Sequence, residues 1–128
     1  MANFQYELLK GVPFVKAIVT GRSLQFRGRF VVDTGAAMTI IRTPKIDALG
    51  YSALDGTSRF STESVIGKED GYCLKVEAFE IFGMKFENLE VGALDLPAHY
   101  NIDGLIGMNV LSKFNWCLHP QVSQISVA

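Results

Sequence analysis

Apolar and polar residues alternate along most of the chain with a period of two, which is the period of β-strands. Glycine-rich turns separate these stretches, for example at residues 21–23, and a polar loop with a glycine near each end lies at residues 66–71. The stretches predicted as strands, from alternation or from a short apolar run, are residues 12–20, 24–32, 38–41, 58–65, 72–81, 86–91 and 122–127. The pattern therefore predicts a mainly β fold, with a hairpin over about residues 58–81.

Two short helices are expected among the strands. The first covers residues 44–49, with Thr43 as its N-cap, Pro44 at its first position and Gly50 directly after its end. The second covers residues 108–114.

Composition and charge limit the function classes. With 128 residues, of which 48% are hydrophobic and 20% charged, residues 1–128 are expected to form a single domain with a core of its own. Twelve basic and thirteen acidic residues leave a net charge of −1, which removes the usual driving force for binding nucleic acid or a membrane surface. No apolar stretch approaches the roughly 18 residues of a membrane helix.

The N-terminus has neither the basic nor the apolar region of a signal peptide, so we expect a cytoplasmic location. A domain excised from a larger protein would show the same features, and that alternative stays open.

Cys73 lies in an alternating apolar stretch and Cys117 follows Trp116, so both are expected to be reduced thiols. A zinc site would need both cysteines with His99 and His119, whose spacing matches no paired-ligand motif, and we expect no metal and no cofactor.

Asp33 is the residue that best fits a chemical role. It follows the apolar Phe30-Val31-Val32 and precedes Thr34-Gly35, so a carboxylate stands at the end of a strand that enters the core. Such a placement costs free energy if the carboxylate has no partner. A simple turn built from Asp and Gly explains the same tripeptide, and both readings remain open on these residues alone.

The wider context resembles the retropepsin-like aspartic proteases. Residues 30–39 (FVVDTGAAMT) resemble the active-site segment of that family, the glycine-shouldered hairpin lies where the family has its flap, and residues 103–111 (DGLIGMNVL) resemble its apolar-apolar-Gly segment and short helix. The resemblance extends over residues 14–127. It implies a closed, antiparallel, barrel-like sheet with a flap and one or two short helices, and a homodimer.

Peptide hydrolysis by this route needs two carboxylates that share one proton, as in aspartic proteases generally. The chain has one D-[ST]-G motif, because the other Asp-Gly pairs, at residues 55, 70 and 103, lack the intervening hydroxyl residue. If the chain is active, the second carboxylate must therefore be Asp33 of another copy, and we expect a homodimer with the site on its two-fold axis.

The resemblance also implies roles for individual residues. Asp33 is the catalytic residue, and the loop is supported by Thr34, Gly35 and Ala36. The residues expected to contact substrate are Ala37, Val65, Ile66, Gly67 and Lys68, and those expected to pack beneath the site are Leu105, Ile106 and Gly107. Ala36 lacks the hydroxyl that many pepsins have there, so we expect an activity optimum less acidic than that of pepsin. Ala37 replaces a frequent Asp or Ser, so substrate preference is expected to differ.

The resulting hypothesis is an aspartic endopeptidase that acts on extended peptides or unfolded proteins. The alternative is a dimeric module of the same fold that binds peptide or protein without cutting it. A third reading is an unrelated small β-barrel with a chance D-T-G. The N-terminal segment and residues 122–127 are candidates for strands of the dimer interface.

Overall fold

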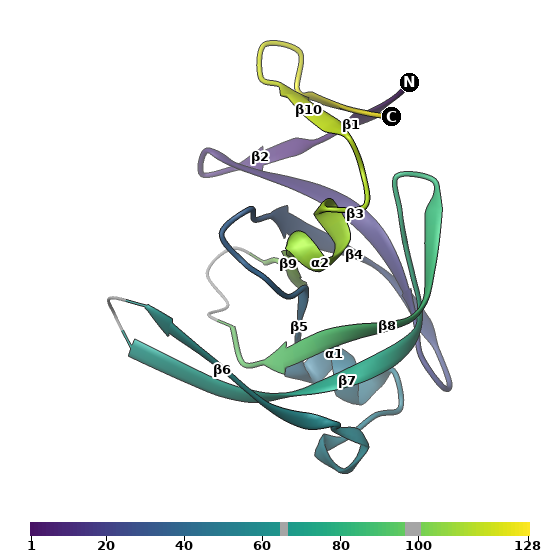
Figure 1. Ribbon diagram of the computed structural model, residues 1–128, viewed down its shortest axis with the longest axis vertical. Coiled ribbons are helices and arrows are strands. Elements are labelled where there is room, and N and C mark those ends of the chain that lie inside the picture. Colours follow the sequence, from purple (N-terminus) through teal and green to yellow (C-terminus); the bar gives the residue numbers. More distant parts are fainter. Residues whose placement is uncertain (65–66, 97–100) are drawn as a thin grey trace.

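The computed structural model describes residues 1–64, 67–96 and 101–128, and most of them lie in strands (Figure 1). The main sheet has eight strands in the order β2-β3-β4-β9-β5-β8-β7-β6. Their bounds are β2 Glu7–Leu9, β3 Val12–Thr20, β4 Gln25–Val32, β5 Ile40–Arg42, β6 Ser58–Ser64, β7 Gly67–Ile81, β8 Met84–Leu94 and β9 Gly104–Ile106.

The sheet closes on itself because β3 pairs with both β4 and β7, for example at Val19, which lies opposite Phe26 on one side and Phe79 on the other. The expected mainly β fold is therefore confirmed. Two of its ladders are parallel, β4 with β9 and β5 with β8, and the pattern of apolar residues did not predict them. The reason is that β5 and β9, each three residues long, are too short to show a period.

The core lies inside this closed sheet. Phe30 and Phe79 are fully buried, and their rings meet edge to face with centroids 5.4 Å apart. Other fully buried side chains come from the strands and both helices, including Ile41, Ile46, Leu74, Ile106 and Leu111. Ile106 directly precedes the segment that holds the Asp33 loop, so its burial anchors that segment to the core.

Two of the predicted helix features need correction. Helix α1 spans Thr43–Ala48, so Thr43 is its first residue; the N-cap is Arg42, which makes no side-chain capping bond. Gly50 adopts a φ of +94°, as expected for a residue that ends a helix. Helix α2 spans Met108–Leu111 and is shorter than predicted, and an unpredicted 3₁₀ turn, η1, spans Ala53–Asp55. Within the described ranges, neither helix has the length and apolar character needed to cross a bilayer.

Both ends of the chain join a separate three-stranded sheet, in the order β1-β11-β10 (Figure 1). Its strands are β1 Ala2–Gln5, β10 Trp116–His119 and β11 Gln124–Val127, and β10 was not among the predicted stretches. The terminal segments expected to form strands with a partner therefore pair with each other. Because β11 has a neighbour on each side, it has no edge left for another chain.

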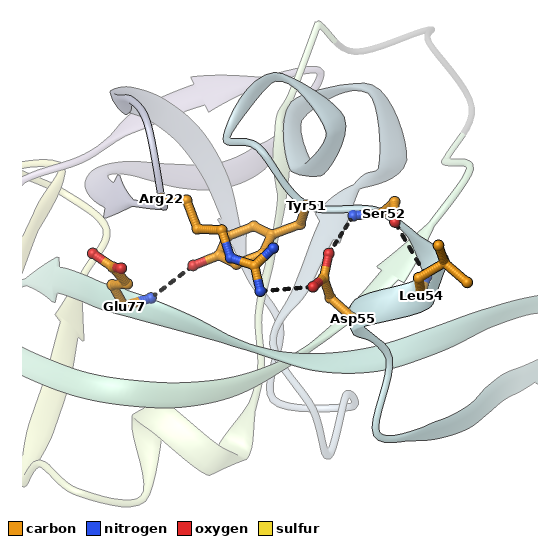
Figure 2. A network of polar contacts seen from close by, with 6 residues as sticks. All are labelled: Arg22, Tyr51, Ser52, Leu54, Asp55 and Glu77. Carbon is orange, nitrogen blue, oxygen red and sulfur yellow. Dashed lines mark hydrogen bonds and ion pairs between the residues drawn. The ribbon is translucent and has the colours of Figure 1, made fainter.

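A polar network ties the β3–β4 turn to the connection after α1 and to β7 (Figure 2). Arg22 forms an ion pair with Asp55 at 2.7 Å, and its guanidinium lies over the Tyr51 ring. Asp55 also accepts a hydrogen bond from the backbone N–H of Ser52. The Tyr51 hydroxyl accepts one from the backbone N–H of Glu77, at 3.2 Å. The network therefore fixes the end of the barrel next to α1.

Tyr72, in the barrel wall, provides a test of the packing. Its hydroxyl oxygen is buried and has no hydrogen-bond partner among the described residues. Burial raises the pKa of Tyr72, and the carboxylates of Asp47, Asp55 and Asp95 raise it further. The buried hydroxyl thus costs free energy that a hydrogen bond would otherwise return.

We predict that Tyr72→Phe leaves the free energy of unfolding unchanged or raises it by up to about 1 kcal/mol, because it removes an unpaired polar group. The matched variant Tyr51→Phe should lower it by about 0.5–1.5 kcal/mol, because the Glu77 N–H loses its acceptor. Urea denaturation followed by fluorescence measures both. Equal losses in the two variants would contradict this account.

Candidate active site

Asp33 lies directly after β4, where the chain leaves the sheet. Its backbone N–H donates to the Ile106 carbonyl at 3.0 Å, which continues the β4–β9 ladder by one residue. Its side-chain Oδ1 accepts a hydrogen bond from the Gly35 N–H at 2.9 Å, and its carbonyl accepts one from the Ala36 N–H. The residue is half-exposed, and no ion pair among the described residues includes it. Asp33 is therefore oriented by its own loop and open to solvent.

The rest of the loop is held by the start of α2. The N–H of Met108 donates to the Ala36 carbonyl at 2.7 Å, and that of Asn109 donates to the Ala37 carbonyl at 3.0 Å. Gly107 makes this approach possible, because a Cβ there would lie 2.6 Å from the Met38 carbonyl oxygen and 2.8 Å from that of Ala36. The loop and the Gly107 segment therefore form one backbone unit.

Asn109 and Thr39 are important to this unit, although sequence reasoning did not select them. The Asn109 Oδ1 accepts hydrogen bonds from both the N–H and the hydroxyl of Thr39, each at 2.8 Å. The Thr39 oxygen in turn accepts from the Gly107 N–H at 3.1 Å, and the Asn109 amide donates to the Glu90 carbonyl at 3.0 Å. Thr39 is fully buried. One signal was available: Thr39 is the polar residue within the apolar stretch of residues 38–41.

The residues expected beneath the site are divided between the core and the surface. Ile106 and Gly107 are buried, whereas Leu105 is half-buried. Leu105 lines a hollow of about 210 Å³ with Leu9, Val12, Val31 and Ile102. Val31 pairs with Leu105 and lies two residues before Asp33, so strand alternation places both Val31 and Asp33 on the same side of the chain. An apolar hollow therefore lies beside the end of β4 that leads to Asp33.

The hairpin expected as a flap is present, but its predicted loop residues belong largely to a strand. Residues 67–71, predicted as a loop, belong to β7, where Gly67 lies opposite Ser64 and Gly71 opposite Phe60. The prediction failed because a run of charged residues between two glycines is typical of a loop. Charged residues are also common in strands at the edge of a sheet, and the sequence alone does not separate the two cases. Val65 and Ile66 lie outside the described residues, and of Lys68 only the strand position is described. In Figure 1 the hairpin extends toward the side on which the β4–β5 loop lies.

The other candidate groups that the structure describes lie on β7 and β10. Cys73 is buried in β7 and Cys117 is exposed on β10, and both thiols are free. The His119 Nε2 lies 2.8 Å from the Ser126 hydroxyl within the terminal sheet, and His99 falls outside the described residues. In the part of the chain that the structure describes, no three His, Cys, Asp or Glu side chains are grouped to hold a metal ion.

Comparisons with known proteins agree with this architecture. The model of the aspartyl protease family matches residues 15–110. A retropepsin-like aspartic protease from Rickettsia conorii is similar over 100% of this chain and 99% of its own, with 15% identity and a TM-score of 0.73. The retroviral protease-like domain of Ddi1 from Leishmania major is similar over 91% and 87%, with 15% identity and a TM-score of 0.63.

The EIAV protease in complex with the inhibitor HBY-793 is similar over 82% of this chain and 89% of its own, with 16% identity and a TM-score of 0.58. A search of curated protein sequences found no match. At these identities the likeness to solved structures concerns the fold, whereas the family match includes Asp33, its loop and the Gly107 segment. The chain therefore belongs to the aspartyl protease family and has the retropepsin-like fold.

Proposed function

We propose that the protein is an aspartic endopeptidase whose active form is a homodimer with one Asp33 from each copy in the site. The observation that carries the proposal is the Asp33 carboxylate itself, oriented by the Gly35 N–H on a loop tied to Ile106 and otherwise unpaired among the described residues. A carboxylate used only to form a turn needs no such attachment to a second segment of the chain.

The second carboxylate is expected from another copy because the other Asp-Gly pairs lie in different surroundings. Asp103 accepts a hydrogen bond from the Arg29 N–H at 2.9 Å and lies 3.7 Å from the Lys45 ammonium. Asp55 is bound to Arg22 and to the Ser52 N–H, and Asp70 lies in β7 opposite Ser61. None of these three residues stands on a loop equivalent to that of Asp33.

The chemistry follows from two carboxylates that share one proton. The ionised Asp33 accepts a proton from water as the water oxygen attacks the peptide carbonyl carbon, and the protonated Asp33 of the other copy donates its proton to the carbonyl oxygen. Collapse of this tetrahedral intermediate breaks the C–N bond, and the amine leaves with a proton from a carboxyl group. The apolar hollow beside Val31 and Leu105 supports binding of an apolar substrate side chain.

We predict that Asp33→Asn lowers the rate of cleavage of an unfolded protein by at least about 10²–10⁴-fold, because it removes the acid–base group, while thermal unfolding stays unchanged. In a mixture, a tenfold excess of Asp33→Asn over wild type should also suppress wild-type activity, because most wild-type chains then pair with a copy that lacks the carboxylate. Equal cleavage by both proteins would refute the proposal. Binding of an unfolded protein without cleavage by either would favour the non-catalytic module.

The tie between Asn109 and Thr39 should position the loop. We predict that Asn109→Ala lowers kcat by about tenfold or more with a smaller change in KM, and lowers the free energy of unfolding by about 1–3 kcal/mol, because the buried Thr39 N–H and hydroxyl lose their acceptor. Lys113→Ala, an exposed change just after α2, serves as the control and should alter neither. A loss of stability with kcat unchanged would limit Asn109 to a structural role.

Ala36 gives a test through pH. A serine hydroxyl at this position should donate to the Asp33 carboxylate and favour its charged form. We therefore predict that Ala36→Ser moves the acidic limb of the kcat/KM profile to lower pH, and that the wild-type optimum lies at a less acidic pH than that of pepsin. A wild-type optimum near pH 2, or an acidic limb that does not move, would contradict this reasoning.

A further inference from the structure

A second hollow, of about 350 Å³, lies where the terminal sheet meets the barrel. It has no lining residue in common with the apolar hollow beside Val31 and Leu105. Arg27, in its wall, precedes Asp33 by six residues, which is about 20 Å of extended chain. The hollow is therefore separate from the candidate active site. The side chains that matter here come from β1, β2, β3, β4 and the turn after β7, and they are Phe4, Glu7, Phe14, Lys16, Arg27 and Phe82.

Three cations share the outer face of β3 and β4. The register places Lys16 directly opposite Arg29, where Cβ atoms lie about 5 Å apart, and diagonally opposite Arg27, at about 7–8 Å. Like charges directly opposite each other destabilise a sheet. Among the residues that the structure describes, none of the three forms an ion pair. This face therefore carries a repulsion that a bound anion relieves.

Two of these cations can reach a ligand in the hollow. The Arg29 guanidinium lies over the Phe14 ring, 5.6 Å from its centroid, whereas the exposed Lys16 and Arg27 line the hollow. A guanidinium has a planar fork that matches a carboxylate, and an ammonium adds a point charge.

Glu7 lines the same hollow and, within the described ranges, forms no ion pair. With Lys16 and Arg27 it makes two cations and one carboxylate, so one positive charge is in excess. A ligand with a single negative charge balances this excess. A phosphate with two charges would meet stronger repulsion from Glu7. The charges of the hollow therefore favour a carboxylate.

Aromatic rings form the apolar part of the hollow. The rings of Phe4 and Phe82 pack with their centroids 5.2 Å apart, and Phe82 also meets Phe114 edge to face at 5.4 Å. Phe82 has a φ of +53°, in the left-handed region that bulky residues rarely adopt. Packing on both sides holds Phe82 in this conformation, so its ring is a fixed part of the wall.

We propose that this hollow binds an organic monocarboxylate whose apolar part packs against the phenylalanine rings. Lys16 and Arg27 bind the carboxylate group. The carboxylate belongs to a free small molecule or to an acidic side chain of a peptide, since both present the same group. The site shares no residue with the Asp33 loop, so it does not depend on the proposed protease activity.

Phenylacetate, an aromatic monocarboxylate, provides the test. In a titration followed by ¹H–¹⁵N NMR, we expect it to shift the backbone amide signals of residues 14–16 and 27. The neutral phenylacetamide should bind with a dissociation constant at least about tenfold higher, because it lacks the charge. Equal binding of the two compounds, or shifts that leave these residues unaffected, would overturn the proposal.

Variants test the two cations. Arg27→Gln and Lys16→Gln should each raise the dissociation constant of phenylacetate by about fivefold or more, because a charge-assisted hydrogen bond is lost. Lys75→Gln, which removes an exposed cation from β7, is the matched control and should leave the constant unchanged. Circular dichroism checks that each variant is folded. Binding by both hollow variants that equals that of wild type would overturn the proposal.

Lys16→Gln has a second readout that needs no ligand. Because it removes the like charge opposite Arg29, the thermal midpoint of unfolding should stay the same or rise. A lower midpoint would contradict the repulsion from which the site is inferred.

Glu7→Gln tests the choice of ligand. It removes the negative charge from the hollow, so phenylacetate should bind about threefold more tightly or better, and inorganic phosphate should gain more than phenylacetate does. Inorganic phosphate that binds wild type as tightly as phenylacetate would overturn the assignment of a monocarboxylate.

A blocked Phe-Glu-Phe peptide identifies the source of the carboxylate. The titration uses Asp33→Asn, so that cleavage does not interfere, and Phe-Gln-Phe serves as the uncharged control. If the Glu peptide shifts the same signals with a dissociation constant no higher than that of phenylacetate, the ligand is an acidic peptide side chain. A higher constant identifies a free small molecule. Both results support the site, whereas the loss of cleavage in Asp33→Asn concerns the proposed function alone.

Discussion

The attachment of the Asp33 loop to residues 106–109 is the constraint on which the rest of the structure depends. Backbone bonds join Asp33 to Ile106 and the start of α2 to Ala36 and Ala37, and the buried Thr39 is bound to Asn109, 70 residues further on. Closing so long a loop costs entropy, and the buried, fully paired polar groups offset that cost only when all of them align. The same attachment holds the end of β9 beside the end of β4, and in the sheet β9 lies between β4 and β5.

The same attachment explains how a carboxylate is tolerated at the end of a core strand. In a single copy Asp33 is half-exposed and receives one N–H bond, so its charge remains in contact with water. The electrostatic conflict that drives the proposed chemistry arises only when a second carboxylate approaches and the two must share a proton. In the proposed mechanism the fold of one chain therefore supplies the position of the carboxylate, and a second copy would supply the other carboxylate.

Strong periodicity explains what could be predicted from the sequence. The strand over residues 12–20 and the helix end at Gly50 were predicted correctly, because each depends on local pattern or backbone conformation. The parallel ladders and the short β9 depend on contacts between distant segments, which leave no local period. Asn109 was missed for the same reason. Its role depends on hydrogen bonds to Thr39 and to the Glu90 carbonyl, which come close only after folding.

The terminal sheet is completed within one chain. β11 has β1 on one side and β10 on the other, so the two ends of the chain pair with each other. The first two residues of α2 bond to the Asp33 loop, and the chain that follows α2 leads into β10. Residues 107–116 therefore connect the segment that positions Asp33 to the sheet that fastens both ends of the chain.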